Sequence, residues 1–337
     1  MTNSDSRSDL KDERIVAEFS KNGFILLKNV FSEERCDQLR TQILNKFDEL
    51  KAIDPQQIDH ALTQSQVFSI PKFWDFLVHE KVVQALKIIL EPKYSLIPNF
   101  TVQKNKFGLI QPSIAKIPIP NRYGWHVDSG GEPFDPDHLA PDYQFVKCGL
   151  YLQDNDPEFG GGIDVVPGSH KLLFRTGINR LDAKIRLFKG KLGVFFNNKT
   201  VPIKKGDVVI FHSFLMHAAT HPKGILENIT ELDKKSSHYS SMPLQKTKLT
   251  LYFDACRSRF ASPFLKVSTQ RARKELTSAG SGAREKLAYY DQLRFLLEQR
   301  YPRELLEQVK KHDIQFARLE GPDLEEAKRV CQLQSTL

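Results

Sequence analysis

Short runs of strand-forming residues, separated by turn residues, fill the middle of the chain and constrain its fold more than any other feature. Gly, Pro, Asn and Asp stand between these runs, and no repeat of fixed period is visible. The runs are 95–107, 145–152, 162–166, 192–196, 207–211 and 249–253. Many short strands with turn signals are typical of a sandwich or barrel, whereas a propeller or solenoid would show a repeat.

Helical patterns flank this β-rich region on both sides. Before it, residues 12–22 predict a helix that ends at Gly23, Phe24–Leu27 predicts a short strand, and Ser32 is a candidate N-cap for a second helix. A further helical pattern covers residues 73–90. After Arg257 the chain is helical again, interrupted at 278–282 by small, flexible residues. We expect one domain over residues 12–256 and a C-terminal helical extension over 257–337.

Composition indicates an ordinary globular protein and excludes several classes. The net charge is +8, but the last 81 residues carry 16 Lys and Arg against 11 Asp and Glu, with the signs mixed, as on a solvated helical face. We therefore expect no nucleic-acid partner. The four cysteines are far apart, so neither a disulfide framework nor a zinc finger is indicated. No apolar leader or run of membrane-spanning length is present, which favours a cytoplasmic protein without a membrane partner.

A histidine and an aspartate are placed to bind one metal ion together. In the sequence Trp125-His126-Val127-Asp128, the two side chains lie two residues apart at the expected end of a strand, so they project to the same face. A His-x-Asp tripeptide also arises by chance, so the pair alone does not establish a metal site. A second histidine from a later strand would complete the two-His-one-carboxylate set typical of non-heme Fe(II) sites. Strand-borne ligands followed by several strands favour a double-stranded β-helix, the cupin-type jelly roll.

Two later histidines compete for the third ligand position. His212 and His217 follow the predicted strand at 207–211, and, five residues apart, they cannot both point inward from one regular strand. Periodicity leaves this choice open.

Four motifs in order resemble the phytanoyl-CoA dioxygenase family. They are the strand Phe24–Leu27 with the helix that follows it, the His126/Asp128 pair, the glycines at 160–162 leading to Pro167-Gly168-Ser169-His170, and Gly206-Asp207 leading to His217. The resemblance spans roughly residues 12–256. It implies a double-stranded β-helix, Fe(II) held by His126, Asp128 and His217, and dependence on 2-oxoglutarate and O2. It also assigns His170 to loop geometry rather than to the metal.

The chain departs from the family where the far carboxylate of 2-oxoglutarate would be anchored. The family's arginine is absent, and aligning 249–253 with the family's last strand places Lys246 at its position, with Lys248 on the same face. Arg257 falls on the opposite face of that strand. Ala219 replaces a family serine, so Thr220 is the candidate substitute. We expect Lys246, then Lys248, to neutralise the carboxylate as a point charge, without the two-pronged geometry of arginine.

The resemblance predicts an enzyme that oxidises a C–H bond of a small molecule, usually to an alcohol, and releases succinate and CO2. Family halogenases carry Gly or Ala at the position of Asp128, so its presence favours hydroxylation. The alternative is a non-catalytic jelly-roll binding or scaffold protein that has lost productive cosubstrate binding. A third possibility is a cupin enzyme that uses Fe or Mn without 2-oxoglutarate. The sequence leaves the substrate and the oligomeric state open.

Overall fold

The computed structural model describes residues 5–53, 61–104, 125–128, 144–156, 160–173, 197–220, 247–277, 283–298 and 300–334. They form two compact units. Unit 1 contains residues 1–37, 103–142 and 149–250, and unit 2 contains residues 38–102, 143–148 and 251–337. Strands β4 (Phe145–Tyr151) and β9 (Leu249–Arg257) each run from one unit into the other.

Unit 1 carries antiparallel strands that pair across long sequence separations. Strand β1 (Phe24–Leu27), which follows helix α1 (Asp5–Asn22), pairs with β7 (Val208–His212), and β7 neighbours β4. A second sheet has the order β6-β5-β8. Its strands are β5 (Ile163–Val165), β6 (Lys199–Thr200) and β8 (His217–Ala219). This second sheet carries one of the predicted metal ligands, His217.

A tight turn at Gly206 hydrogen-bonds the start of β7 to the segment that precedes helix α2 (Glu33–Ile53). Gly206 has φ +88°, and its carbonyl accepts hydrogen bonds from the backbone N–H groups of Val30 and Phe31, both at 3.1 Å. A Cβ added at Gly206 would lie 2.2 Å from the Phe31 carbonyl oxygen. Only glycine fits this close approach of two backbones.

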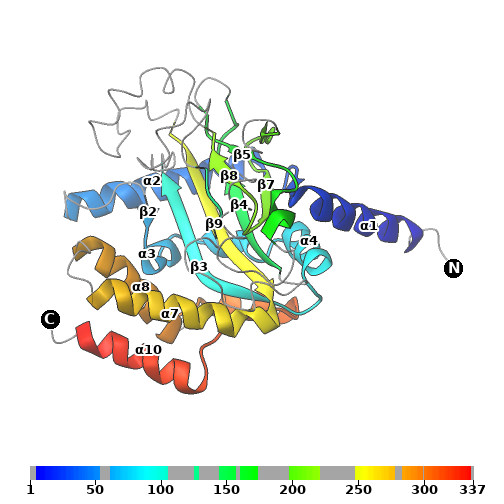
Figure 1. Cartoon of the computed structure of the whole chain (residues 1–337). Coiled ribbons are helices and arrows are strands. Elements are labelled where there is room, and N and C mark those ends of the chain that lie inside the picture. Colours follow the sequence, from blue (N-terminus) through cyan, green and yellow to red (C-terminus); the bar gives the residue numbers. More distant parts are fainter. Residues whose placement is uncertain are drawn as a thin grey trace, which may run out of the picture. The chain divides into compact units, whose positions relative to one another are not determined.

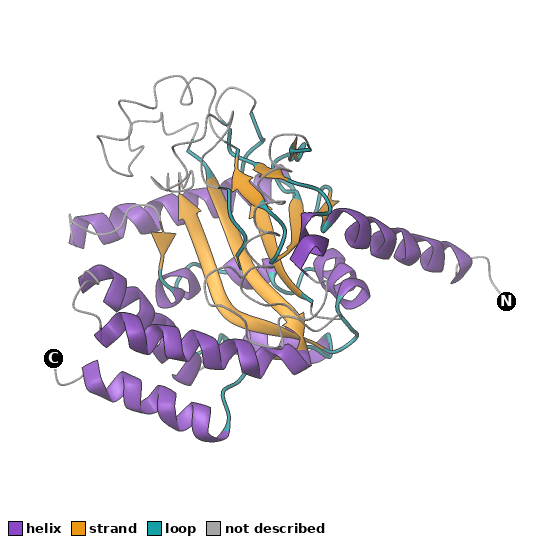
Figure 2. Cartoon of the chain, in the orientation of Figure 1, coloured by secondary structure: helices purple, strands orange, loops and turns teal. Residues whose placement is uncertain are grey.

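Unit 2 combines long strands with most of the helices (Figures 1 and 2). Its strands have the order β4-β9-β3-β10, in which β3 (Tyr94–Lys104) also pairs with β2 (Ala61–Leu62), and β10 (Gln315–Phe316) runs parallel to β3. Around them are α3 (Gln64–Phe68), η1 (Phe73–Phe76), α4 (Glu80–Ile89), α7 (Ala261–Thr277), α8 (Ala283–Glu298), α9 (Arg303–Lys311) and α10 (Gly321–Gln334). Helices α7, α8 and α10 pack on one another.

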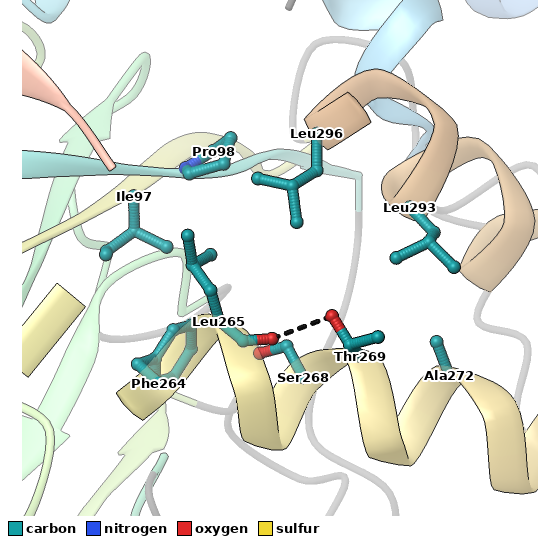
Figure 3. Close-up of a pocket in the computed structure, with 9 residues that line it drawn as sticks. All are labelled: Ile97, Pro98, Phe264, Leu265, Ser268, Thr269, Ala272, Leu293 and Leu296. Carbon is teal, nitrogen blue, oxygen red and sulfur yellow. Dashed lines mark hydrogen bonds between the residues drawn. The ribbon is translucent and has the colours of Figure 1, made fainter. Parts of the chain in front are cut away.

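Apolar packing holds the helices of unit 2 to strand β3. Phe68 stacks on Phe295 of α8 at a ring-centroid distance of 4.7 Å and meets Phe100 of β3 edge-on at 5.0 Å. Nearby, α7, α8 and β3 line a small apolar pocket (Figure 3). Its lining residues are Ile97, Pro98, Phe264, Leu265, Ser268, Thr269, Ala272, Leu293 and Leu296. The Thr269 hydroxyl donates to the Leu265 carbonyl at 2.9 Å, so this buried polar group is satisfied within its own helix.

The structure confirms the predicted β core with flanking helices and corrects three details. Helix α1 begins at Asp5 rather than at residue 12. The helix expected over 73–90 is interrupted, because His79 takes an extended backbone (φ −63°, ψ 128°) and separates η1 from α4. The last long strand runs on to Arg257 rather than ending at residue 253. The strand expected at 192–196 and the break at 278–282 lie outside the described residues. Among the helices that the structure describes, none is long and apolar enough to span a membrane.

Candidate metal centre

The backbone brings His126 and His217 face to face. They form an antiparallel bridge in which each N–H donates to the other residue's carbonyl at 2.9 Å. Directly opposed residues of an antiparallel pair project to the same side, and the two imidazole centroids are 4.3 Å apart. The segment 125–127 thus lies beside β8, and β5 lies on the other side of β8, since Val165 is paired with His217.

The carboxylate of Asp128 lies between the two imidazoles. One oxygen is 3.6 Å from Nε2 of His126, and the other is 3.7 Å from Nε2 of His217. The Asp128 backbone N–H donates to the Ser213 carbonyl at 2.9 Å, which ties this residue to the turn before β8. The exposed fraction of the side chains falls from 52% for His126 to 19% for Asp128 and 7% for His217.

A hydrogen bond orients the ring of His217. Its Nδ1 lies 2.9 Å from the Leu215 carbonyl oxygen, an acceptor that requires Nδ1 to carry the proton. Nε2, which lies 3.7 Å from Asp128, is therefore left with the lone pair that can ligate a metal. A backbone carbonyl that fixes the tautomer in this way is the usual partner of a metal-ligating histidine.

The donor set fits a divalent transition-metal ion. Within the described part of the chain, His126, Asp128 and His217 form a group whose ligand atoms all lie within 4.8 Å of one another. Bonds of about 2.1 Å to one ion would put neighbouring ligands roughly 3 Å apart, so small side-chain rotations bring the three donors to bonding distance. Two imidazoles and one carboxylate on one side leave the remaining coordination positions open, as in non-heme Fe(II) oxygenases.

Two of the three predicted cosubstrate residues meet at the carbonyl of Gly162. The buried Nζ of Lys248 donates to this oxygen at 3.2 Å, and the backbone N–H of Thr220 donates to it at 3.0 Å. Gly162 lies three residues before Val165, the partner of His217, which corresponds to about 10 Å along the strand. Lys246 lies outside the described residues.

The hydroxyl of Thr220 is part of a polar network that the sequence did not reveal. It donates to Asp164 Oδ1 at 2.8 Å, and Thr200 donates to the same oxygen at 2.8 Å. Asn155 Nδ2 lies 3.5 Å from the Thr220 hydroxyl oxygen. Four residues from separate strands and turns create this network, so no local motif could have indicated it.

Gln153 also fixes the glycine turn beside Lys248. Its amide nitrogen donates to the Gly161 carbonyl at 2.8 Å, and its amide oxygen accepts from the backbone N–H of Leu249 at 2.7 Å. Arg257 has a different role, because its Nε donates to the Leu90 carbonyl at 3.0 Å within unit 2.

His212 and His170 pack against one another rather than joining the group of metal-binding candidates. Their ring centroids are 5.4 Å apart, and Nδ1 of His212 accepts from the Phe214 backbone N–H at 3.0 Å. His170 lies against Gly23, where an added Cβ would lie 2.4 Å from its Nδ1. Burial, followed by the nearby Lys171, lowers the pKa of His170 to about 4.

The lowered pKa of His170 predicts a stability that depends on pH. A buried neutral histidine stabilises the folded state fully above its unfolded pKa of about 6.5, and this contribution is lost as pH falls towards 4. We expect His170 to account for up to about 3 kcal/mol of the difference in unfolding free energy between pH 7 and pH 4. Urea unfolding at pH 7 and pH 4 measures this difference, and His170→Gln should show a smaller loss. An equal loss in both proteins would contradict this assignment.

A comparison with protein-family models assigns the chain to a family. The model described as phytanoyl-CoA dioxygenase matches residues 19–223, more than half of the chain. The chain therefore belongs to the phytanoyl-CoA dioxygenase family, and the prediction of an enzyme of this class is confirmed. No curated protein sequence matches the chain.

Solved structures with similar folds have low sequence identity to the chain. HygX from Streptomyces hygroscopicus, with nickel and 2-oxoglutarate bound, is 16% identical over 72% of this chain and 86% of its own, with a TM-score of 0.46. SnoN, an alpha-ketoglutarate-dependent epimerase from nogalamycin biosynthesis, is 15% identical over 74% and 82%, with a TM-score of 0.45. AviO1 from Streptomyces viridochromogenes is 14% identical over 73% and 94%, with a TM-score of 0.44.

Proposed function

We propose that the protein is an Fe(II)- and 2-oxoglutarate-dependent dioxygenase that hydroxylates a C–H bond of a small molecule. The observation that supports this most strongly is the convergence of His126, Asp128 and His217, in a chain of the phytanoyl-CoA dioxygenase family. The balanced reaction takes substrate R–H, 2-oxoglutarate and O2 to R–OH, succinate and CO2. Bound Fe(II) supplies the redox chemistry of this reaction.

The residues of the chain bind and orient the reactants. His126, Asp128 and His217 hold the metal on one side, and the Leu215 carbonyl keeps the His217 ring in the tautomer that can ligate. Lys248 supplies the positive charge for the far carboxylate of 2-oxoglutarate. Its Nζ binds the Gly162 carbonyl, three residues or roughly 10 Å along the strand from Val165, the partner of His217, and a five-carbon dicarboxylate would bridge such a span to the metal.

Replacing Lys248 should weaken binding of 2-oxoglutarate far more than it changes turnover. Lys248→Met keeps the apolar stem and removes the charge, so we expect the KM for 2-oxoglutarate to rise about 30-fold. This corresponds to the loss of one charged hydrogen bond of about 2 kcal/mol. Lys246→Met is the matched control, because it removes the other candidate cation. Steady-state kinetics would contradict the assignment to Lys248 if only the Lys246 variant raised KM.

The proposed activity is tested by stoichiometric succinate formation. With Fe(II), ascorbate, O2 and 2-oxoglutarate, the protein should release succinate, and addition of a metabolite extract should produce new masses larger by one oxygen atom. Succinate formation should require both Fe(II) and 2-oxoglutarate. Oxidation of a substrate with no dependence on 2-oxoglutarate would instead favour a cupin oxygenase of another kind.

The alternative predicted from the sequence is a non-catalytic binding or scaffold protein; the missing arginine favours it, whereas the family assignment opposes it. A lysine gives less geometric specificity for a carboxylate than an arginine does. Metal binding without any succinate formation, over a broad substrate screen, would support this alternative. We also infer a small-molecule substrate, a cytoplasmic location, and the division into residues 12–256 and a helical extension at 257–337; these stay predictions.

A further inference from the structure

The face of the ligand-bearing segments that points away from the metal site forms a small apolar cluster. Since His126 and His217 are directly opposed and project to one side, the neighbouring residues Val127 and Met216 project to the other. Met216 and Val166 are both 3% exposed and form a buried cluster, against which Trp125 and Val127 pack. The cluster thus touches both segments that carry the candidate ligands.

The backbone of Met216 is held from two directions by a single loop. The Ser169 hydroxyl oxygen accepts the Met216 N–H at 2.8 Å, and the Met216 carbonyl accepts the Val166 N–H at 2.9 Å. Ser169 is buried, and its own N–H donates to the Val166 carbonyl at 3.1 Å. Both polar groups of the Met216 backbone are therefore fixed immediately before His217.

The same loop is anchored at its far side. The Gly168 N–H donates to the Asn22 carbonyl at 2.8 Å, and the His170 ring lies against Gly23. The loop therefore has a fixed position from which Ser169 can hold Met216. A side chain that holds a ligand-bearing backbone in this way affects metal affinity even though it does not touch the metal.

Building on the proposed function, we propose that Met216 is a positioning residue of the metal site. Its backbone, held by Ser169, places His217, while its side chain forms, with Val166, the cluster against which Val127 and Trp125 pack, and so helps to place the segment that carries His126 and Asp128. Met216 thereby sets the spacing between the two halves of the ligand set. Truncating this contact should loosen the site, and removing the hydrogen bond from Ser169 should do the same through the backbone.

The test is a titration of the metal-free protein with Co(II), whose visible absorption reports the number and geometry of its ligands. Met216→Ala and Ser169→Ala should each weaken Co(II) binding about 10-fold or more and change the intensity of the bands. Met216→Leu keeps the apolar contact and should stay within about threefold of the wild type. Val127→Ala truncates the packing on the same cluster from the side of the His126 segment, so the test does not depend on the folding of one variant.

A matched control separates positioning from stability. Ser32→Ala also removes a serine oxygen that accepts a backbone N–H, that of Arg35 at 3.2 Å at the start of α2, and it should leave the Co(II) affinity unchanged. The inference is overturned if the Met216, Ser169 and Val127 variants lose only stability and retain the wild-type Co(II) affinity and spectrum. If the wild type itself binds no Co(II), the proposed function fails together with the inference.

Discussion

Asp128→Ala should reduce hydroxylation below detection and weaken Fe(II) binding by about 100-fold or more. Asp128 provides the one carboxylate of the ligand group, and its oxygens lie 3.6 and 3.7 Å from the two imidazoles. Its loss leaves two neutral ligands for a divalent cation and removes the group that both rings face. Succinate formation and equilibrium metal binding measure the two effects.

A second aspartate of unit 1 provides the control for this prediction. Asp154 interacts with the exposed Lys204 at 3.2 Å and accepts the Lys205 N–H at 2.8 Å. Asp154→Ala should therefore leave metal binding and turnover close to those of the wild type. Full activity of Asp128→Ala would refute the ligand assignment, as would an equal loss in both variants.

Gly206→Ala should destabilise the protein by about 3–5 kcal/mol, the largest stability effect that we expect from adding one methyl group. At φ +88° an alanine is strained by about 1–3 kcal/mol, and its Cβ would lie 2.2 Å from the Phe31 carbonyl oxygen. To relieve that contact, the turn at Gly206 would have to move. This movement would disrupt the hydrogen bonds that Val30 and Phe31 donate to the Gly206 carbonyl. Urea unfolding monitored by circular dichroism measures the loss.

Gly321→Ala is the control for the close contact. Gly321 also has positive φ, +54°, but an added Cβ would meet no atom within 4 Å. Only the cost of the positive φ remains, so we expect Gly321→Ala to lower the free energy of unfolding by about 1 kcal/mol. If the two variants lost the same free energy, the close approach of Gly206 to Phe31 would not be what requires glycine.

The sequence predicted the pair of strand-borne ligands but could not choose the third one without a family resemblance. His212 ends β7 and His217 begins β8, and the five-residue spacing suits neither strand nor helix periodicity. The structure shows how the chain separates them. Residues 213–215 form a turn, after which His217 pairs with His126 while His212 packs against Phe19 and His170.

Contacts between distant segments could not be predicted from local patterns. The meeting of Lys248 and Thr220 at Gly162 joins parts of the chain that lie 86 residues apart. The pairing of β10 with β3 joins residues separated by 220 positions. Strands β1, β3, β4, β5, β7 and β9 were predictable because turn residues bound them, whereas the short strands β2, β6, β8 and β10 were not predicted. The register between strands depends on packing over the whole fold.

The most direct test of the central claim is the anaerobic addition of Fe(II) and then 2-oxoglutarate to the metal-free protein, followed by visible absorption. The proposed function predicts a weak charge-transfer band from 2-oxoglutarate chelated to the iron at one site per chain, and its loss in Asp128→Ala. Tight binding of one Fe(II) per chain with no such band at saturating 2-oxoglutarate would contradict it.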